Sequence, residues 1–286
     1  MRDAPLADPG ENWGVTHSRS KIVELLDSHG LRPSRALGQN FVSDPNTVRR
    51  IARFAEVGEG DRVVEIGAGL GSLTLALVET GARVTAVEVD KYVLPVLREI
   101  AEPVGVEVVE ADALAIDWGT VVAPTERATV VDNLPYNVGT TIVTRILDTA
   151  PQLDRMVVMV QKEVAERLAA NVGDDAYGAL SVKIRYHATA KLLGTVPPTV
   201  FVPQPEVHSA LVEIRRLPEP AVDADPEVLF ALVKAGFGQR RKMLRRSLAG
   251  LVDAEAFERA GIAPTARAEE LDVVDWGRLV AAKAGA

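Results

Sequence analysis

Five short apolar runs, most of them rich in valine, alternate with helical patterns between residues 62 and 171, and this alternation limits the possible folds more than any other feature. Valine-rich runs that lack polar alternation are typical of strands buried on both faces of a parallel sheet. The pattern therefore predicts an α/β fold with helices on both faces of the sheet. The expected strands are 62–66, 83–88, 106–110, 128–132 and 155–160, and the expected helices lie near 71–80, 91–101, 138–148 and 161–171.

The segments on either side of this alternation predict smaller units. The first twenty or so residues lack periodicity, residues 21–28 predict a short helix, and Asp44 with Pro45 predicts the start of another that runs to Phe54. A helix over 178–187 precedes two strands, 191–196 and 208–215, which we expect to be antiparallel. We therefore expect a flexible extension over residues 1–30, the α/β domain over 31–217 and a small all-helical domain over 218–286.

Composition excludes several classes of protein. The chain has no cysteine, which excludes disulfides, thiolate metal sites and cysteine nucleophiles. It shows neither a signal-peptide pattern nor an apolar stretch of the roughly 20 residues that a membrane helix needs, so we expect a cytoplasmic protein. The formal net charge is −8, yet six cations against one acid fall between Pro226 and Gly250. This asymmetry indicates a polyanion-binding surface formed by Lys234, Arg240, Arg241, Lys242, Arg245 and Arg246.

A glycine-rich turn follows the first strand of the alternation. Gly67, Gly69 and Gly71 lie between a strand and a helix, where missing side chains let the backbone approach a ligand closely. A dinucleotide fingerprint would place its third glycine where Ser72 stands, so a pyrophosphate ligand is disfavoured. A Gly-x-Gly-x-Gly turn preceded by Glu65 is instead the spacing typical of S-adenosylmethionine sites.

Acidic residues end the next two strands. Glu88 lies about 20 residues beyond the turn, where a carboxylate can accept hydrogen bonds from both hydroxyls of a ribose. Asp112 ends the third strand and could accept from the exocyclic amine of an adenine. Because Glu65, Glu88 and Asp112 end successive parallel strands, they share one edge of the sheet, and together they predict a cofactor site there.

The tetrapeptide Asn133-Leu134-Pro135-Tyr136 directly follows another expected strand. An aromatic exocyclic amine is a poor nucleophile because its lone pair is delocalised into the ring. The side-chain oxygen of Asn133 and the carbonyl of Leu134 could accept its N–H protons, while Pro135 fixes the backbone and Tyr136 stacks on the base. With a methyl donor on the neighbouring strand end, this predicts methylation of an amine by orientation and electrostatics.

These motifs together resemble the small-subunit ribosomal RNA adenine dimethyltransferases, from about Leu31 to the end of the chain. The resemblance implies a Rossmann-like S-adenosylmethionine-dependent methyltransferase sheet with a small helical C-terminal domain. It also implies that Asn40 and Val42 touch the cofactor and that Phe201 encloses the target adenine opposite Tyr136. Asp132 departs from the family, in which glycine or alanine is frequent. Further family signatures are 37–41, 160–164, 177–182, 201–210 and 237–244.

The resemblance implies a substrate that the residues alone do not. The substrate would be two adjacent adenosines in the hairpin near the 3′ end of 16S ribosomal RNA, each dimethylated at N6, in an immature 30S subunit. We expect a monomer without a metal. Two alternatives remain open at this point, a resistance-type methyltransferase acting on 23S ribosomal RNA and a ribosome-assembly factor whose methylation is secondary. An NAD-dependent dehydrogenase fails on Ser72.

Overall fold

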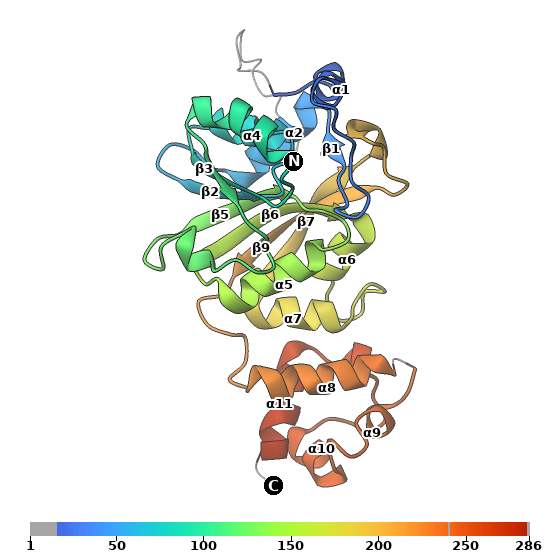
Figure 1. Cartoon of the computed structure of the whole chain (residues 1–286). Helices are drawn as coiled ribbons and strands as arrows, with labels where there is room; N and C mark the ends of the chain where they lie inside the picture. The colour runs from blue at the N-terminus through green and yellow to red at the C-terminus, as the bar shows by residue number, and fades with distance from the viewer. Residues whose placement is uncertain (1–15, 240, 285–286) are drawn as a thin grey trace, which may run out of the picture.

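The computed structural model describes residues 16–239 and 241–284, and over this part of the chain the main sheet has seven strands (Figure 1). Their order is β4-β3-β2-β5-β6-β9-β7. The first five strands are parallel, and β9 is antiparallel to both of its neighbours, as we expected for the last two strands. The strands are β2 (Arg62–Ile66), β3 (Arg83–Glu88), β4 (Glu107–Glu110), β5 (Ala128–Asn133), β6 (Leu153–Gln161), β7 (Ala188–Val196) and β9 (Ser209–Arg216).

Helices cover both faces of this sheet, which confirms the predicted α/β architecture. Successive strand residues point to opposite faces, so Val63 and Val131 lie in one buried cluster while Val64 and Val130 lie in another. The first cluster packs against α2 (Pro45–Ala55), α3 (Ser72–Val78) and α4 (Leu94–Ala101). The second packs against α5 (Gly139–Thr149), α6 (Lys162–Ala169) and α7 (Ala179–His187). The inner strands β2, β3, β5 and β6 lack polar alternation because helices keep water from both of their faces.

The strand order changes direction between β2 and β5. From β2 the chain adds β3 and β4 on one side, and then crosses to add β5 and β6 on the other. Loops leaving the carboxyl ends of β2 and β5 therefore part in opposite directions and leave a crevice between them. Open α/β sheets bind their ligands at such a switch point.

The segment before Leu31 differs from the expected flexible extension. Residues 1–15 lie outside the described residues, but from Thr16 onward the chain is packed, and α1 (Arg19–Ser28) buries Ile22, Leu25 and Leu26. These side chains contact a cluster that includes Leu70 and Val96. Periodicity over 21–28 predicted the helix, but a local sequence pattern does not show which surface of the protein a short helix will pack against. The expectation of flexibility is therefore wrong for residues 16–30.

The C-terminal part is helical, as predicted, and Figure 1 shows it beneath α7, at the end of the molecule away from α1. It contains α8 (Pro226–Gly238), α9 (Leu244–Ser247), α10 (Ala254–Ala260) and α11 (Val273–Ala284), packed around Trp276 and Phe257. The same buried cluster includes Tyr177 and Tyr186 from the sheet-bearing part. Among the described residues, no helix is long and apolar enough to cross a membrane.

Candidate functional site

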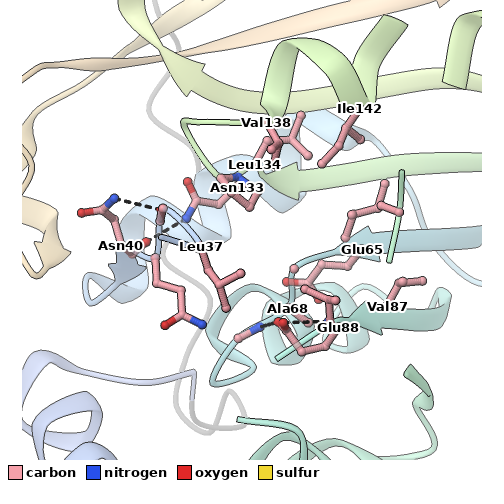
Figure 2. Close-up of a pocket in the computed structure, with 18 of the residues that line it drawn as sticks. Leu37, Asn40, Glu65, Ala68, Val87, Glu88, Asn133, Leu134, Val138 and Ile142 are labelled. Atoms are coloured by element: carbon pink, nitrogen blue, oxygen red, sulfur yellow. Dashed lines mark hydrogen bonds between the residues drawn. The ribbon is translucent and has the colours of Figure 1, made fainter. Parts of the chain in front are cut away.

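A pocket opens at the carboxyl ends of β2 and β5, on the switch point of the sheet (Figure 2). It is closed on another side by residues 36–42, which include the short strand β1 (Phe41–Val42). Eight of the nine residues that we predicted for the cofactor line this pocket; they are Asn40, Val42, Glu65, Gly67, Gly69, Glu88, Asp112 and Asn133. Three residues predicted for the acceptor, Leu134, Pro135 and Tyr136, line the same pocket.

The glycine turn needs glycine for two different reasons. Gly67, Gly69 and Gly71 all have positive φ angles, of 74°, 57° and 80°, which residues other than glycine rarely adopt. A Cβ atom on Gly69 would also lie 2.8 Å from the ring of Phe41. Gly71 does not line the pocket; a Cβ there would meet Leu97 of α4 at 3.5 Å. Gly71 therefore serves the turn and its packing rather than contacting a ligand.

Glu88 is fixed by the turn that faces it. Its Oε2 accepts the Gly69 N–H at 2.8 Å, and its Oε1 accepts the N–H groups of Val89 and Asp90 at 2.9 and 2.8 Å. Burial raises the pKa of this carboxyl, and the three backbone donors oppose that rise. A carboxylate offers about four lone-pair positions, so about one remains on Oε2. We had expected Glu88 to accept hydrogen bonds from both ribose hydroxyls, but the remaining position has room for a hydrogen bond from one of them.

Two further carboxyls are buried beneath the pocket. Glu65 is 2% exposed, accepts a hydrogen bond from the Thr74 hydroxyl at 2.5 Å, and has its pKa raised to about 8, mainly by burial. Burial also raises the pKa of Asp132 well above its usual value, and the neighbouring Glu65 adds to the rise. Asp132 Oδ2 accepts the Ile66 N–H at 3.0 Å and so joins the end of β5 to the end of β2. A pKa of about 8 leaves Glu65 mostly protonated at pH 7, and burial disfavours the charged form of Asp132 as well.

Asp112 lies in a different environment, at the exposed rim of the pocket. Its Oδ1 accepts the Leu114 N–H at 2.8 Å, which orders the loop after β4. Solvent contact makes a charged carboxylate inexpensive there. The three acids that we grouped by strand end are thus one buried acid, one backbone-bound carboxylate and one rim carboxylate.

Asn133, the last residue of β5, carries the most informative polar atom of the pocket. Its Nδ2 donates to the Asn40 carbonyl at 3.0 Å, which fixes the plane of the amide (Figure 2). Its Oδ1 is buried and has no hydrogen-bond partner among the described residues. A buried acceptor left unpaired costs about 1–3 kcal/mol. An orphan of this kind, held rigidly beside a pocket, is suited to a donor that a ligand supplies.

The three residues after Asn133 form a stiff wall. The Leu134 N–H donates to the Met159 carbonyl of β6 at 3.0 Å, while the Leu134 carbonyl receives no hydrogen bond from the described residues. Pro135 accepts the N–H groups of Val138 and Gly139 and so starts the turn into α5. The Tyr136 hydroxyl is hydrogen-bonded to Ser209, which fixes the ring, and burial raises the pKa of that phenol.

Phe201 does not lie where the resemblance placed it. The ring is completely buried in the cluster that contains Val42 and Met159, and it does not line the pocket. Its strand, β8 (Phe201–Val202), pairs with β1, so the backbone that carries Phe201 is tied to the loop beside the pocket. In this structure Phe201 supports that wall from behind, and the expectation that it encloses a base opposite Tyr136 is not met.

The structure adds residues that sequence reasoning did not select. Gln39 donates to Asp90 at 2.7 Å, and Asn137 donates to the Ala36 carbonyl at 2.7 Å, so both hold the loop that closes the pocket. The available signals were positions alone, since Asn137 directly follows Tyr136 and Gln39 lies within the family signature 37–41. Four apolar residues also line the pocket, Ile66 and Val87 at strand ends and Val138 and Ile142 at the start of α5, and no sequence signal marks them beyond these places.

The predicted RNA-binding cations are not part of this pocket. Lys234, Arg241, Lys242, Arg245 and Arg246 lie in α8, α9 and the segment between them, and all five side chains are exposed. None of the five has an ion pair with another described residue. Arg240 lies outside the described residues. Strands β2 and β5, at whose ends the pocket lies, and helices α8 and α9 belong to different parts of the fold (Figure 1).

Comparisons with known proteins agree with this geometry. The model of the family described as "Ribosomal RNA adenine dimethylase" matches residues 31–284. A protein of Cutibacterium acnes named "Ribosomal RNA small subunit methyltransferase A" is 47% identical over 283 residues, covering 93% of this chain and 94% of its own. A protein of Paracoccus denitrificans with the same name is also 47% identical, covering 93% and 96%.

Two solved structures resemble the fold. The crystal structure of the 23S rRNA methyltransferase ErmE matches with a TM-score of 0.66 and 27% identity, covering 85% of this chain and 99% of that one. A dimethyladenosine transferase from Plasmodium falciparum matches with a TM-score of 0.68 and 23% identity, covering 82% and 94%. The family match and the close relatives confirm the resemblance drawn from the motifs, and the chain belongs to the ribosomal RNA adenine dimethylase family.

Proposed function

We propose that this protein transfers methyl groups from S-adenosylmethionine to N6 of two adjacent adenosines in the 3′-terminal hairpin of 16S ribosomal RNA. The single observation that carries the proposal is the Asn133 amide, whose nitrogen is engaged by Asn40 while its buried oxygen is free. The family and the small-subunit relatives at 43–47% identity supply the class of RNA and the base.

The pocket fits the proposed cofactor, which would supply a methyl group on a sulfonium. Gly67 and Gly69 present backbone without side chains, where an amino-acid moiety would approach. Glu88 keeps about one lone-pair position for a ribose hydroxyl, and Asp112 at the rim could accept from the adenine amine. Asn40, Val42 and Glu65 would complete the site.

The acceptor chemistry follows from the Asn133 and Leu134 oxygens. An adenine N6 amine can donate one N–H to Asn133 Oδ1 and the other to the Leu134 carbonyl. These two hydrogen bonds favour a pyramidal nitrogen, whose lone pair is no longer fully delocalised into the ring. The two oxygens are fixed before the substrate arrives, so little reorganisation is needed. The nitrogen loses a proton after methyl transfer, so no strong base is required. The raised pKa values of Glu65 and Asp132 are consistent with this, since burial disfavours the charged form of both carboxyls.

Two successive transfers place different demands on these oxygens. A monomethylated amine keeps one N–H, so only one of the two acceptor contacts remains for the second transfer. The amide of Asn133 is locked by Asn40, whereas the Leu134 carbonyl belongs to a turn stiffened by Pro135. Both oxygens stay in place when one loses its donor, which allows the second methyl group to be added at the same site.

Recognition of the base and of the RNA would be divided between the two parts of the chain. Tyr136 would stack on a base extruded from an RNA loop, a contact worth about 1–3 kcal/mol. The exposed cations of α8, α9 and the segment between them would bind phosphates of the surrounding RNA. We extend the proposal to an immature 30S subunit as the partner, a monomeric enzyme, and a cytoplasmic location.

The 23S-directed alternative has less support. The 23S methyltransferase ErmE is 27% identical to this chain, against 43–47% for the small-subunit relatives. An assembly factor that has lost methylation would not need a complete pocket, and here the predicted turn and tetrapeptide lie together.

The direct test is methyl transfer from labelled cofactor to immature 30S particles, followed by nucleoside analysis and primer extension on both ribosomal RNAs. We expect N6,N6-dimethyladenosine at two adjacent positions of 16S ribosomal RNA. Label confined to 23S ribosomal RNA would replace the proposal with the resistance-type activity. Binding of particles without any transfer would favour the assembly factor.

A further inference from the structure

Two residues before α1 contact the glycine turn from behind. The Thr16 hydroxyl donates to the Ser72 carbonyl at 2.7 Å, and His17 Nε2 lies 2.9 Å from the Leu70 carbonyl. Both side chains are buried, with 2% and 4% exposed. A carbonyl oxygen only accepts, so Nε2 of His17 carries the proton and donates. The backbone on either side of Gly71 is therefore held by side chains that are 53 and 56 residues away in the sequence.

The same segment is anchored at two other walls of the site. Ile22, Leu25 and Leu26 of α1 lie in one buried cluster with Phe41 and Leu70. Arg19 Nη1 donates to the Phe201 carbonyl at 3.3 Å, on the strand that pairs with β1. Residues 16–28 thus join the glycine turn and the paired strands β1 and β8 into one unit.

We propose that Thr16 and His17 are positioning residues for the cofactor, which hold the turn from Gly67 to Ser72 in its binding geometry through the Leu70 and Ser72 carbonyls. The inference rests on the cofactor site proposed above. It adds a segment that lies before residue 31, where the family match begins. Neither residue lines the pocket, so both act through the turn rather than by contact with the cofactor.

A turn of this kind needs support from outside. Three glycines with positive φ lie within five residues, and glycine loses more conformational freedom on folding than any other residue. A pre-formed turn binds its ligand without that ordering cost. His17 Nδ1 is buried without a partner among the described residues, and burial lowers the pKa of the ring, so His17 is held neutral. The segment is suited to lowering the cost of cofactor binding, and it has no evident part in methyl transfer itself.

The test compares variants that remove one donor with variants that keep it. Thr16→Val removes the hydroxyl at nearly constant volume, and Thr16→Ser restores it. His17→Phe removes the Nε2 donor, and His17→Gln places an amide N–H near the same point. Thr149→Val is a control for loss of a hydroxyl far from the turn, because that exposed hydroxyl also donates to a helix carbonyl, that of Arg145, on α5. Equilibrium binding of labelled S-adenosylmethionine to the full chain, kcat and KM for the cofactor, and thermal unfolding are measured for each.

We expect Thr16→Val and His17→Phe each to weaken cofactor binding by about fivefold, the size expected for one hydrogen bond. KM for the cofactor rises by the same factor while kcat stays within about twofold. Thr16→Ser, His17→Gln and Thr149→Val bind within about twofold of the wild type. If Thr16→Val does not fold, the His17 pair provides the same comparison.

The inference is overturned if the donor-removing variants bind the cofactor as the wild type does. A lower melting temperature with that unchanged affinity would make the segment purely structural. Failure of the wild type to bind S-adenosylmethionine would instead contradict the proposed function, so the two failures can be told apart.

Discussion

The polar groups at the β2–β5 edge of the sheet and those of the basic surface on α8, α9 and the segment between them differ in burial and in hydrogen bonding. At the sheet edge, Glu65, Glu88, Asp132 and Asn133 are buried or partly buried, and each is held by a hydrogen bond to a named atom. In the helical part, Arg241 and Arg245 are exposed and have no ion pair with a described residue. Ligand binding at the sheet edge therefore depends on the fixed positions of single groups, whereas binding by the basic surface depends on the total charge.

This difference predicts how each region responds to mutation. A buried group in a fixed network cannot be replaced by a neighbour, so one substitution at the sheet edge has a large effect that salt does not screen. Exposed cations act together through the field they create, so each contributes little and salt reduces all of them. Mutations at the edge should change cofactor binding or turnover, whereas mutations in the helices should change RNA affinity alone.

Gly69→Ala should have the largest effect on cofactor binding. The substitution forces a side chain into a positive φ of 57° and places Cβ 2.8 Å from the Phe41 ring. Strain of about 1–3 kcal/mol plus displacement of the ring should weaken S-adenosylmethionine binding by roughly 100-fold. Gly30→Ala is the matched control, since Gly30 has a φ of 62° with no atom within 4 Å of the added Cβ. Equal affinities for the two variants would contradict a role for the Gly69 contact.

Charge reversal on the basic surface formed by α8, α9 and the segment between them should have a smaller effect, and one that depends on salt. Arg241→Glu with Arg245→Glu should weaken RNA binding by about tenfold at low salt and reduce the salt slope by about 2, with cofactor affinity unchanged. The control reverses two exposed arginines elsewhere, Arg53 and Arg83. RNA titrations at several salt concentrations measure both effects. An unchanged slope would remove this surface from the RNA site.

Glu65→Gln should show its effect in the pH dependence of stability. The folded-state pKa of Glu65 is raised to about 8 from 4.5, so the folded protein holds this proton more tightly than the unfolded chain. Its contribution to stability is therefore complete below about pH 4.5 and is lost as pH rises towards 8, at up to about 1.4 kcal/mol per pH unit. Urea unfolding between pH 5 and 8.5 should show a flatter profile for the variant. Parallel profiles would mean that Glu65 is ionised at neutral pH.

The sequence predicted the pocket residues at the strand ends better than it predicted the contacts that distant segments make with them. Strand ends carry their own signals, because a valine-rich run stops at a glycine, an acid or an amide; hence Glu65, Glu88, Asp112 and Asn133 were found. The family resemblance added Asn40 and Val42, which also line the pocket. The orientation of the Asn133 amide, whose oxygen is unpaired, is fixed by the hydrogen bond from its nitrogen to the carbonyl of Asn40. Asn40 is 93 residues away, so no local pattern encodes this contact.

Three features could not be predicted, for related reasons. Phe201 carries a family motif, but its burial depends on how β8 pairs with β1. Thr16 and His17 lie in a stretch without periodicity, and their role depends on two carbonyls of the distant turn. The raised pKa values of Glu65 and Asp132 follow from their common burial, which is a property of the packed sheet. Each depends on contacts between segments that are far apart in the chain.

Single-turnover methyl transfer by Asn133→Ala tests the central claim most directly. RNA and cofactor are both held at saturating concentrations, their affinities are measured separately, and Asn46→Ala on the exposed first turn of α2 serves as the control. Because Asn133 Oδ1 orients the amine, we predict a rate at least about 100-fold below the wild type, with RNA affinity unchanged within about twofold. A rate within a few-fold of the wild type would contradict the assignment of Asn133 as the group that orients the acceptor.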